Sequence, residues 1–165
     1  MDSIELIRLN LVRSAERVLL KIDEMRPHAL VPATPGGGAH TLWVLGHLAY
    51  VEGLVVRELV LGEANPIADW AELFDGAAVS TDPSDYPAFD DVLARCRRMR
   101  GETLGVLGSL DESDLDRASA RVPDGFEDTF GTYRDALQYL ADHWYMHRGQ
   151  LAGARRAAGV DRMWV

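Results

Sequence analysis

The sequence predicts an all-α protein built as a four-helix bundle. Four long segments carry apolar residues at intervals of three and four, the spacing that places them on one face of a helix. No stretch between these segments alternates apolar and polar residues as a half-buried strand does. The chain has 165 residues, enough for one domain with its own core, and we predict a single helical-bundle domain over residues 1–165.

The first helix is predicted to run from Ser3 to Met25. Asp2 and Glu5 have the spacing of a capping box at its start, and Pro27 lies just beyond its end. The stripe expected to face the core consists of Ile4, Ile7, Leu11, Ala15, Val18 and Ile22.

The second helix is predicted from Thr41 to Leu61, between the "PGGG" of residues 35–38 and Gly62, which can end a helix. It is the longest apolar tract, yet it is interrupted by His47, Glu52, Arg57 and Glu58. These interruptions indicate a buried helix rather than a membrane span.

The third helix is predicted to begin at Pro87, a favourable first position, and to end near Leu110. The connections on either side of it, residues 62–86 and 111–131, are long. Connections of this length are uncommon unless they cover a site, carry short elements or mediate assembly.

The fourth helix is predicted to follow Thr132 and to run to Ala158. Thr132 and Asp135 resemble a capping box, and Gly159 suits the left-handed position just past a helix end. With four long amphipathic helices in one chain, a four-helix bundle is the expected architecture.

The formal net charge is −9, and most of it lies in residues 62–91, which contain no Lys or Arg. Such a surface repels phosphate, so we expect no nucleic-acid partner. Cys96 is the only cysteine, which excludes an intrachain disulfide and fits a reducing cytoplasm. The first residues, "MDSIELIRLN", lack a basic region followed by an apolar core, so we expect no signal peptide and no membrane association.

His143 and His147 lie four residues apart in the fourth helix, in the segment "HWYMH". Residues at this spacing share a helix face, so two imidazoles can reach one metal ion. Their stripe is otherwise mostly apolar, which indicates that both face the bundle interior. Buried histidines need partners, and either a metal ion or a hydrogen-bonded pair would provide them.

His47 favours the metal, because it lies on an apolar stripe of the second helix and provides a third inward-facing imidazole. Three histidines from two helices can converge on one ion, and three neutral imidazoles with an open position describe a catalytic rather than a structural site. The two remaining histidines fit less well. His28 lies just past the first helix, and His40 is expected at the cap of the second.

Several other residues are weaker candidates. Gln150 shares the face of the histidine pair and could orient a ligand, and Tyr50 could reach the open metal position or simply be a buried, hydrogen-bonded tyrosine. Glu52 and Asp142 are expected on the solvated surface. The basic run "RCRRMR" around Cys96 is expected to form a solvated helix face. The tryptophans that could line a pocket or a dimer contact are Trp70 and Trp164.

The segments "TLWVLGHLAYVEG" and "HWYMHRGQL", together with the closing "RRAAGV", resemble the DinB/YfiT-like family of metalloenzymes over nearly the whole chain. The resemblance implies a DinB-like four-helix bundle, a homodimer, and a metal held by His47, His143 and His147. The resemblance is compatible with zinc, nickel or iron as that metal. Trp144 follows His143 at a position where many relatives carry an acidic residue, so no general base is expected there.

The resemblance also implies a function. Some family members are thiol-dependent transferases or isomerases that use bacillithiol, mycothiol or glutathione, so we expect an enzyme that acts on small molecules through a metal-activated thiolate. If water is the nucleophile instead, the reaction would be a hydrolysis. The remaining alternatives are a non-catalytic metal-binding protein of the stress response and a purely structural bundle.

Overall fold

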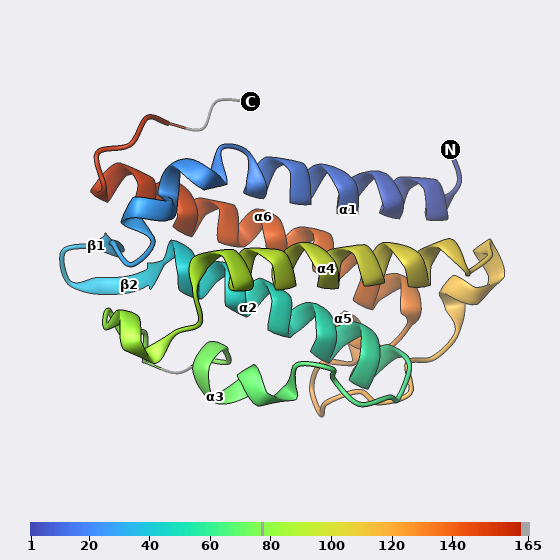
Figure 1. The fold of residues 1–165 in the computed structure, drawn as a ribbon. Coiled ribbons are helices and arrows are strands. Elements are labelled where there is room, and N and C mark those ends of the chain that lie inside the picture. Colours follow the sequence, from blue (N-terminus) through green and yellow to red (C-terminus); the bar gives the residue numbers. More distant parts are fainter. Residues whose placement is uncertain (77, 163–165) are drawn as a thin grey trace.

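The computed structural model describes residues 1–76 and 78–162 and confirms the all-α fold class. Figure 1 shows four long helices lying side by side, α1 (Ser3–Leu19), α2 (Thr41–Gly53), α4 (Phe89–Gly108) and α6 (Tyr133–Ala157). Shorter elements connect them: η1 (Ile22–His28), β1 (Pro32–Thr34), β2 (Gly37–His40), η2 (Leu54–Val60), η3 (Ala68–Trp70), α3 (Ala71–Phe74), η4 (Pro83–Asp85), η5 (Glu112–Asp116) and α5 (Glu127–Phe130).

The core forms where α1 packs against α6 and α2 packs against α4. Large apolar side chains from these helices are fully buried there, among them Leu11, Leu45, Leu48, Leu137 and Leu140. Burying a leucine of this kind contributes about 1.5–3 kcal/mol relative to leaving it exposed. Within the described residues, no helix is both long enough and apolar enough to cross a membrane.

The first helix ends earlier than predicted, at Leu19 instead of Met25. Lys21 adopts a left-handed conformation with φ 55°, and the chain continues as the 3-10 helix η1. Arg155 of α6, only 2% exposed, donates to the Lys21 carbonyl at 3.1 Å and reaches the Glu24 carboxylate at 2.5 Å. This contact ties η1 to the last turns of α6, and it depends on a residue more than a hundred positions away.

The prediction of no strand between the helices is wrong for a small hairpin of β1 and β2. Pro35 and Gly36 of the "PGGG" segment form its turn, and Gly37 and Gly38, both with positive φ, begin β2. The hairpin packs against α6 at Gly153, where an added Cβ would lie 3.2 Å from that of Ala33. Just after the hairpin, His40 caps α2 as predicted, because its Nδ1 accepts from the backbone N–H of Trp43 at 3.0 Å.

The remaining helix ends agree with the sequence except at one point. Thr132 caps α6 by accepting from the backbone N–H of Asp135, and Gly159 takes a positive φ beyond its end. Pro87, however, lies before α4, which begins at Phe89 with Ala88 as its cap. The second helix spans its predicted length, but its last seven residues form the π-helix η2 before Gly62.

Both long connections carry short helices and lie along the bundle. In the first, α3 packs against α2; in the second, α5 packs against α6 and η2. Figure 1 shows α3 running beneath α2 on the lower side of the bundle. Trp70 in the first connection packs against the ring of Phe74, with centroids 4.9 Å apart, whereas Trp164 lies outside the described residues.

Candidate metal centre

The structure brings His47 of α2 together with His143 and His147 of α6. The Nε2 atom of His143 lies 3.2 Å from that of His47 and 3.0 Å from that of His147. All three candidate ligand atoms lie within 4.8 Å of one another. The three predicted ligands thus form a single cluster between two helices.

Hydrogen bonds fix the orientation of two of the rings. Nδ1 of His47 donates to the backbone carbonyl of Phe74 at 2.7 Å, and Nδ1 of His147 donates to Oε1 of Gln150 at 2.7 Å. A neutral imidazole has one proton, so both rings present a bare lone pair at Nε2. The prediction that Gln150 orients a ligand side chain therefore has a contact to support it.

The third ring is not satisfied by the protein. Nδ1 of His143 is buried and has no hydrogen-bond partner among the described residues. With its proton on Nε2, His143 leaves Nδ1 as an orphaned acceptor; with its proton on Nδ1, three lone pairs face one another. Either arrangement costs free energy in a buried site, whereas a cation would accept all three lone pairs.

Burial favours the neutral form of all three imidazoles. Burial lowers the pKa of His143 to about 3, with further lowering by His147, His47 and Arg100. Burial also lowers the pKa of His147 to about 4, again with a contribution from His47. The pKa of His47 is lowered by burial as well. Because a histidine must be deprotonated to bind a metal, protons do not compete for this site near pH 7.

Two of the three separations between the ring nitrogens fit a divalent ion. Metal–nitrogen bonds of about 2.0–2.1 Å imply nitrogen separations of about 3.3–3.4 Å at tetrahedral angles and about 2.8–3.0 Å at right angles. The separations of 3.0 and 3.2 Å from His143 fall between these values. Neutral imidazoles suit zinc, nickel and iron, so the donor set agrees with the three metals that the family resemblance implies.

A glycine next to His47 makes its orientation possible. A Cβ on Gly46 would overlap the ring of Phe74, so only a glycine lets α3 pack directly on α2. That packing holds the Phe74 carbonyl on Nδ1 of His47. Trp43 supports the other side of the imidazole, stacked at a centroid distance of 4.7 Å and an interplanar angle of 9°. Neither Phe74 nor the role of Gly46 was predicted from the sequence.

Replacing Gly46 with alanine is expected to lower the free energy of unfolding by about 1–3 kcal/mol, because overpacking must displace the Phe74 ring. Zinc affinity should fall with it, since the Phe74 carbonyl would no longer hold His47. Urea unfolding and zinc titration would measure the two effects. The matched control is Gly105→Ala in α4, where an added Cβ meets nothing within 4 Å; it should stabilise by about 0.5–1 kcal/mol. Equal behaviour of the two variants would contradict the assigned role of Gly46.

A cavity of about 280 Å³ adjoins the histidine cluster, and His47 and His143 form part of its wall. The remaining lining is mostly apolar: Val51, Leu54, Val55, Leu59, Pro123, Phe126, Phe130 and Tyr139, with Asp75. Tyr50 is 7% exposed and is not among the described residues that line this cavity. Burial raises the pKa of its hydroxyl, and the Asp75 carboxylate raises it further. Its buried position favours the more conservative of its two predicted roles.

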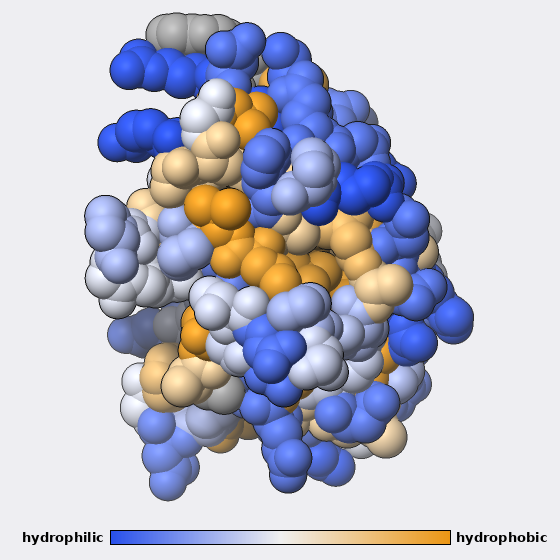
Figure 2. Space-filling view, turned by 60° about the vertical axis from the view of Figure 1, so that its left-hand side comes forward, coloured by the Kyte–Doolittle hydropathy of each residue, from blue (hydrophilic) through white to orange (hydrophobic). Residues whose placement is uncertain are grey.

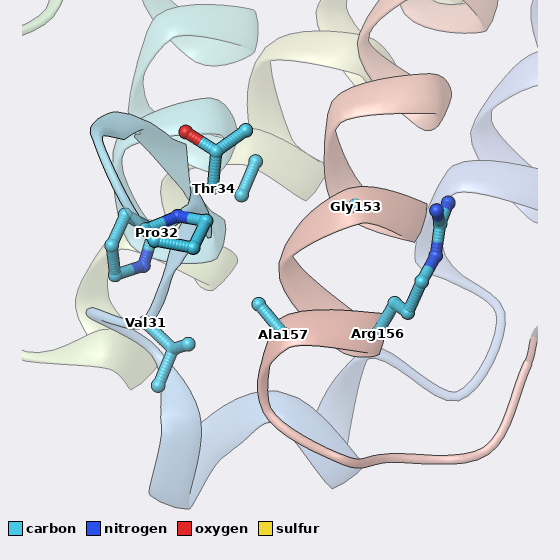
Figure 3. A pocket seen from close by; sticks show the side chains of 8 residues that line it. Val31, Pro32, Thr34, Gly153, Arg156 and Ala157 are labelled. Carbon is cyan, nitrogen blue, oxygen red and sulfur yellow. The ribbon is translucent and has the colours of Figure 1, made fainter.

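A second hollow lies at the hairpin end of the bundle. Figure 2 shows this end, where apolar side chains are exposed between hydrophilic ones. The hollow, about 430 Å³, lies between β1 and the last turns of α6 and is larger than the cavity beside the histidines. Figure 3 shows the side chain of Arg156 directed away from Val31 and Pro32. No histidine is among the described residues that line this hollow, whereas His47 and His143 line the smaller cavity. The smaller cavity is therefore the candidate site.

The prediction that Glu52 is solvated is wrong. Glu52 is 1% exposed and lies 2.5 Å from the guanidinium of Arg100, which is itself 3% exposed. Arg100 in turn stacks over the ring of Trp144 at 4.3 Å and donates to the Leu11 and Leu140 carbonyls. Trp144, at the position where the family resemblance leads one to look for an acidic residue, is therefore a buried packing residue of the core. The basic run is solvated at Arg97 and Arg98 but not at Arg100.

The other candidates lie as follows. Asp142 is exposed, as predicted, and accepts from Gln138 at 3.1 Å. Cys96 is fully buried, and burial raises the pKa of its thiol to about 12, which makes it unreactive. His28 lies in η1, outside the histidine cluster.

The sequence model of the DinB superfamily matches residues 10–151, a range that contains all three histidines. No curated protein matches the chain.

Proposed function

Because this chain belongs to the DinB superfamily, we propose that it is a metal-dependent enzyme that acts on small molecules. The observation that carries the proposal is the convergence of three neutral imidazole nitrogens at the wall of an apolar cavity. A structural metal site has no need of an adjoining cavity, whereas a catalytic site needs an open position beside one.

His47, His143 and His147 would hold the ion. When bound, a divalent metal would supply Lewis acidity that lowers the pKa of a thiol or a water molecule and so provides a nucleophile at neutral pH. The protein contributes orientation and exclusion of water. Phe74 and Gln150 fix the ring planes of two ligands, and the apolar walls shield the reacting groups from solvent.

Of the possible nucleophiles, we favour the sulfur of a low-molecular-weight thiol, with transfer to an electrophilic small molecule or its isomerisation. The family resemblance supports this choice, and the mostly apolar cavity is consistent with it. Cys96 does not compete for the role of nucleophile, because its thiol is buried away from the cavity lining.

The test combines elemental analysis with turnover assays on the purified protein. Zinc, nickel or iron at one equivalent, with transfer from bacillithiol, mycothiol or glutathione to a panel of electrophiles, would support the proposal. Both should be lost in His143→Gln and kept in His28→Gln. Metal binding with hydrolysis alone would replace thiol transfer by a hydrolase, and metal binding without any turnover would favour a non-catalytic role. Failure to bind any of the three metals would overturn the proposal.

The predicted homodimer, the single-domain organisation and the cytoplasmic location stay predictions. They do not enter the argument for the metal centre, whose three histidines all come from one chain.

A further inference from the structure

We infer that the cavity beside the histidines is a binding site for a flat, uncharged ring, and that the substrate of the proposed enzyme carries such a ring. The statement that the ring belongs to a substrate rests on the proposed function, but binding of the ring itself requires no metal. It follows from the nature of the two walls, from the size of the cavity and from its charge.

One wall is a row of aromatic rings that leads from the surface to the metal centre. Phe126, 52% exposed, lies 6.0 Å from Phe130, centroid to centroid. Phe130 meets Tyr139 edge-on at 4.8 Å, and Tyr139 stacks on His143 at 5.4 Å with an interplanar angle of 21°. Centroid distances of 4.5–7 Å are those at which aromatic rings attract one another, so this wall can accept a further ring.

A second wall is aliphatic and is formed largely by an unusual helix. Leu54, Val55 and Leu59 belong to the π-helix η2, in which the backbone N–H of Leu61 bonds the carbonyl of Val56, five residues back. A π-helix is much rarer than an α-helix and is frequently found at functional sites. Here three of its side chains line the cavity, so the π-helix lies at the candidate site.

The size and charge of the cavity select the ligand. An empty cavity of about 150 Å³ lined by apolar groups suffices for benzene, so about 280 Å³ holds one substituted ring. Asp75 is the only charged side chain in the lining that the structure describes, and neither lysine nor arginine is present there to bind an anionic group. A flat uncharged ring therefore fits against the walls, with its reactive substituent directed to His47 and His143.

The experiment uses 4-fluorobenzyl alcohol as the probe and fluorine NMR as the readout, on protein stripped of metal by a chelator. We expect saturable binding of the probe. We expect cyclohexylmethanol and 4-fluorobenzoate to displace it only at higher concentrations. Leu54→Trp should fill the cavity and weaken binding more than about tenfold, whereas the same substitution at exposed Leu6 should not change it. Phe126→Ala, at an exposed position where the fold is not at risk, should weaken binding about two- to tenfold.

The outcomes separate this inference from the proposed function. Binding of the ring to His147→Gln protein that no longer binds zinc would support the inference even if the enzyme proposal failed, because His147 belongs to the histidine cluster but not to the described lining of the cavity. Zinc binding without saturable binding of the ring would overturn the inference and leave the proposed function standing. Unchanged affinity in both Leu54→Trp and Phe126→Ala would place the probe elsewhere and also overturn it.

Discussion

Replacing His143 with glutamine is expected to lower the affinity of the protein for zinc more than 100-fold. His143 is the central member of the cluster, since its Nε2 lies within 3.2 Å of both other Nε2 atoms. Removing a partner that only orients a ligand typically costs 10–100-fold in affinity, so removal of the ligand itself should exceed that range. Competition with a chromophoric chelator would measure the change.

Two further variants make this result specific. Gln150→Ala removes only the acceptor for Nδ1 of His147 and should lower zinc affinity about 10–100-fold, between the parent and His143→Gln. His28→Gln makes the same exchange outside the cluster and should leave affinity unchanged. If His143→Gln bound zinc as tightly as the parent protein, the three histidines would not be the site.

Replacing Arg100 with methionine is expected to lower the free energy of unfolding by about 3–5 kcal/mol, because it leaves the buried carboxylate of Glu52 without its cation. Burial already raises the pKa of Glu52, although Arg100 opposes this shift. Without Arg100, the folded protein should bind a proton at Glu52 that the unfolded chain lacks at pH 7. The variant should therefore lose stability as the pH rises, and the deficit at pH 5 should be smaller than at pH 7.

The matched control lies two residues away in the same helix. Arg98 is exposed and pairs with Glu102 at 3.0 Å, so Arg98→Met should change the unfolding free energy by at most about 1 kcal/mol. The double variant Glu52→Leu, Arg100→Met should regain much of the loss, because a buried ion pair replaced by apolar residues is often neutral. A deficit in the double variant as large as in Arg100→Met would contradict this account. Denaturant titrations at both pH values would measure all of these effects.

The parts of the fold that the sequence predicts are those that depend on local patterns. The apolar spacing and the cap at Thr132 suffice to place α6, and the inward stripe suffices to bring its histidines toward α2. The break at Lys21 and the burial of Glu52 were missed because both depend on a distant arginine. Periodicity shows which face of a helix is buried but not which residue from another helix meets it.

The candidate metal site shows the same division between local and distant determinants. His47, His143 and His147 could be predicted because each lies on an apolar helix face, and Gln150 because it follows His147 by three residues. Phe74 acts through its carbonyl, which its side-chain identity does not reveal. A signal was present, however: Gly46 and Gly53 lie two turns apart on one face of an otherwise apolar helix. An added Cβ at either position would overlap the first connection, at Phe74 and Asn65 respectively.

The contact between Gly46 and Phe74 has a consequence for how this protein can change during evolution. A side chain of any chemistry at position 46 overlaps an aromatic ring for as long as that ring occupies the space beside it. A lineage could escape only by a paired exchange, in which a smaller residue first appears at position 74 and a methyl group then enters at 46. The two positions should therefore drift together, and mutational tolerance at one should depend on the residue at the other.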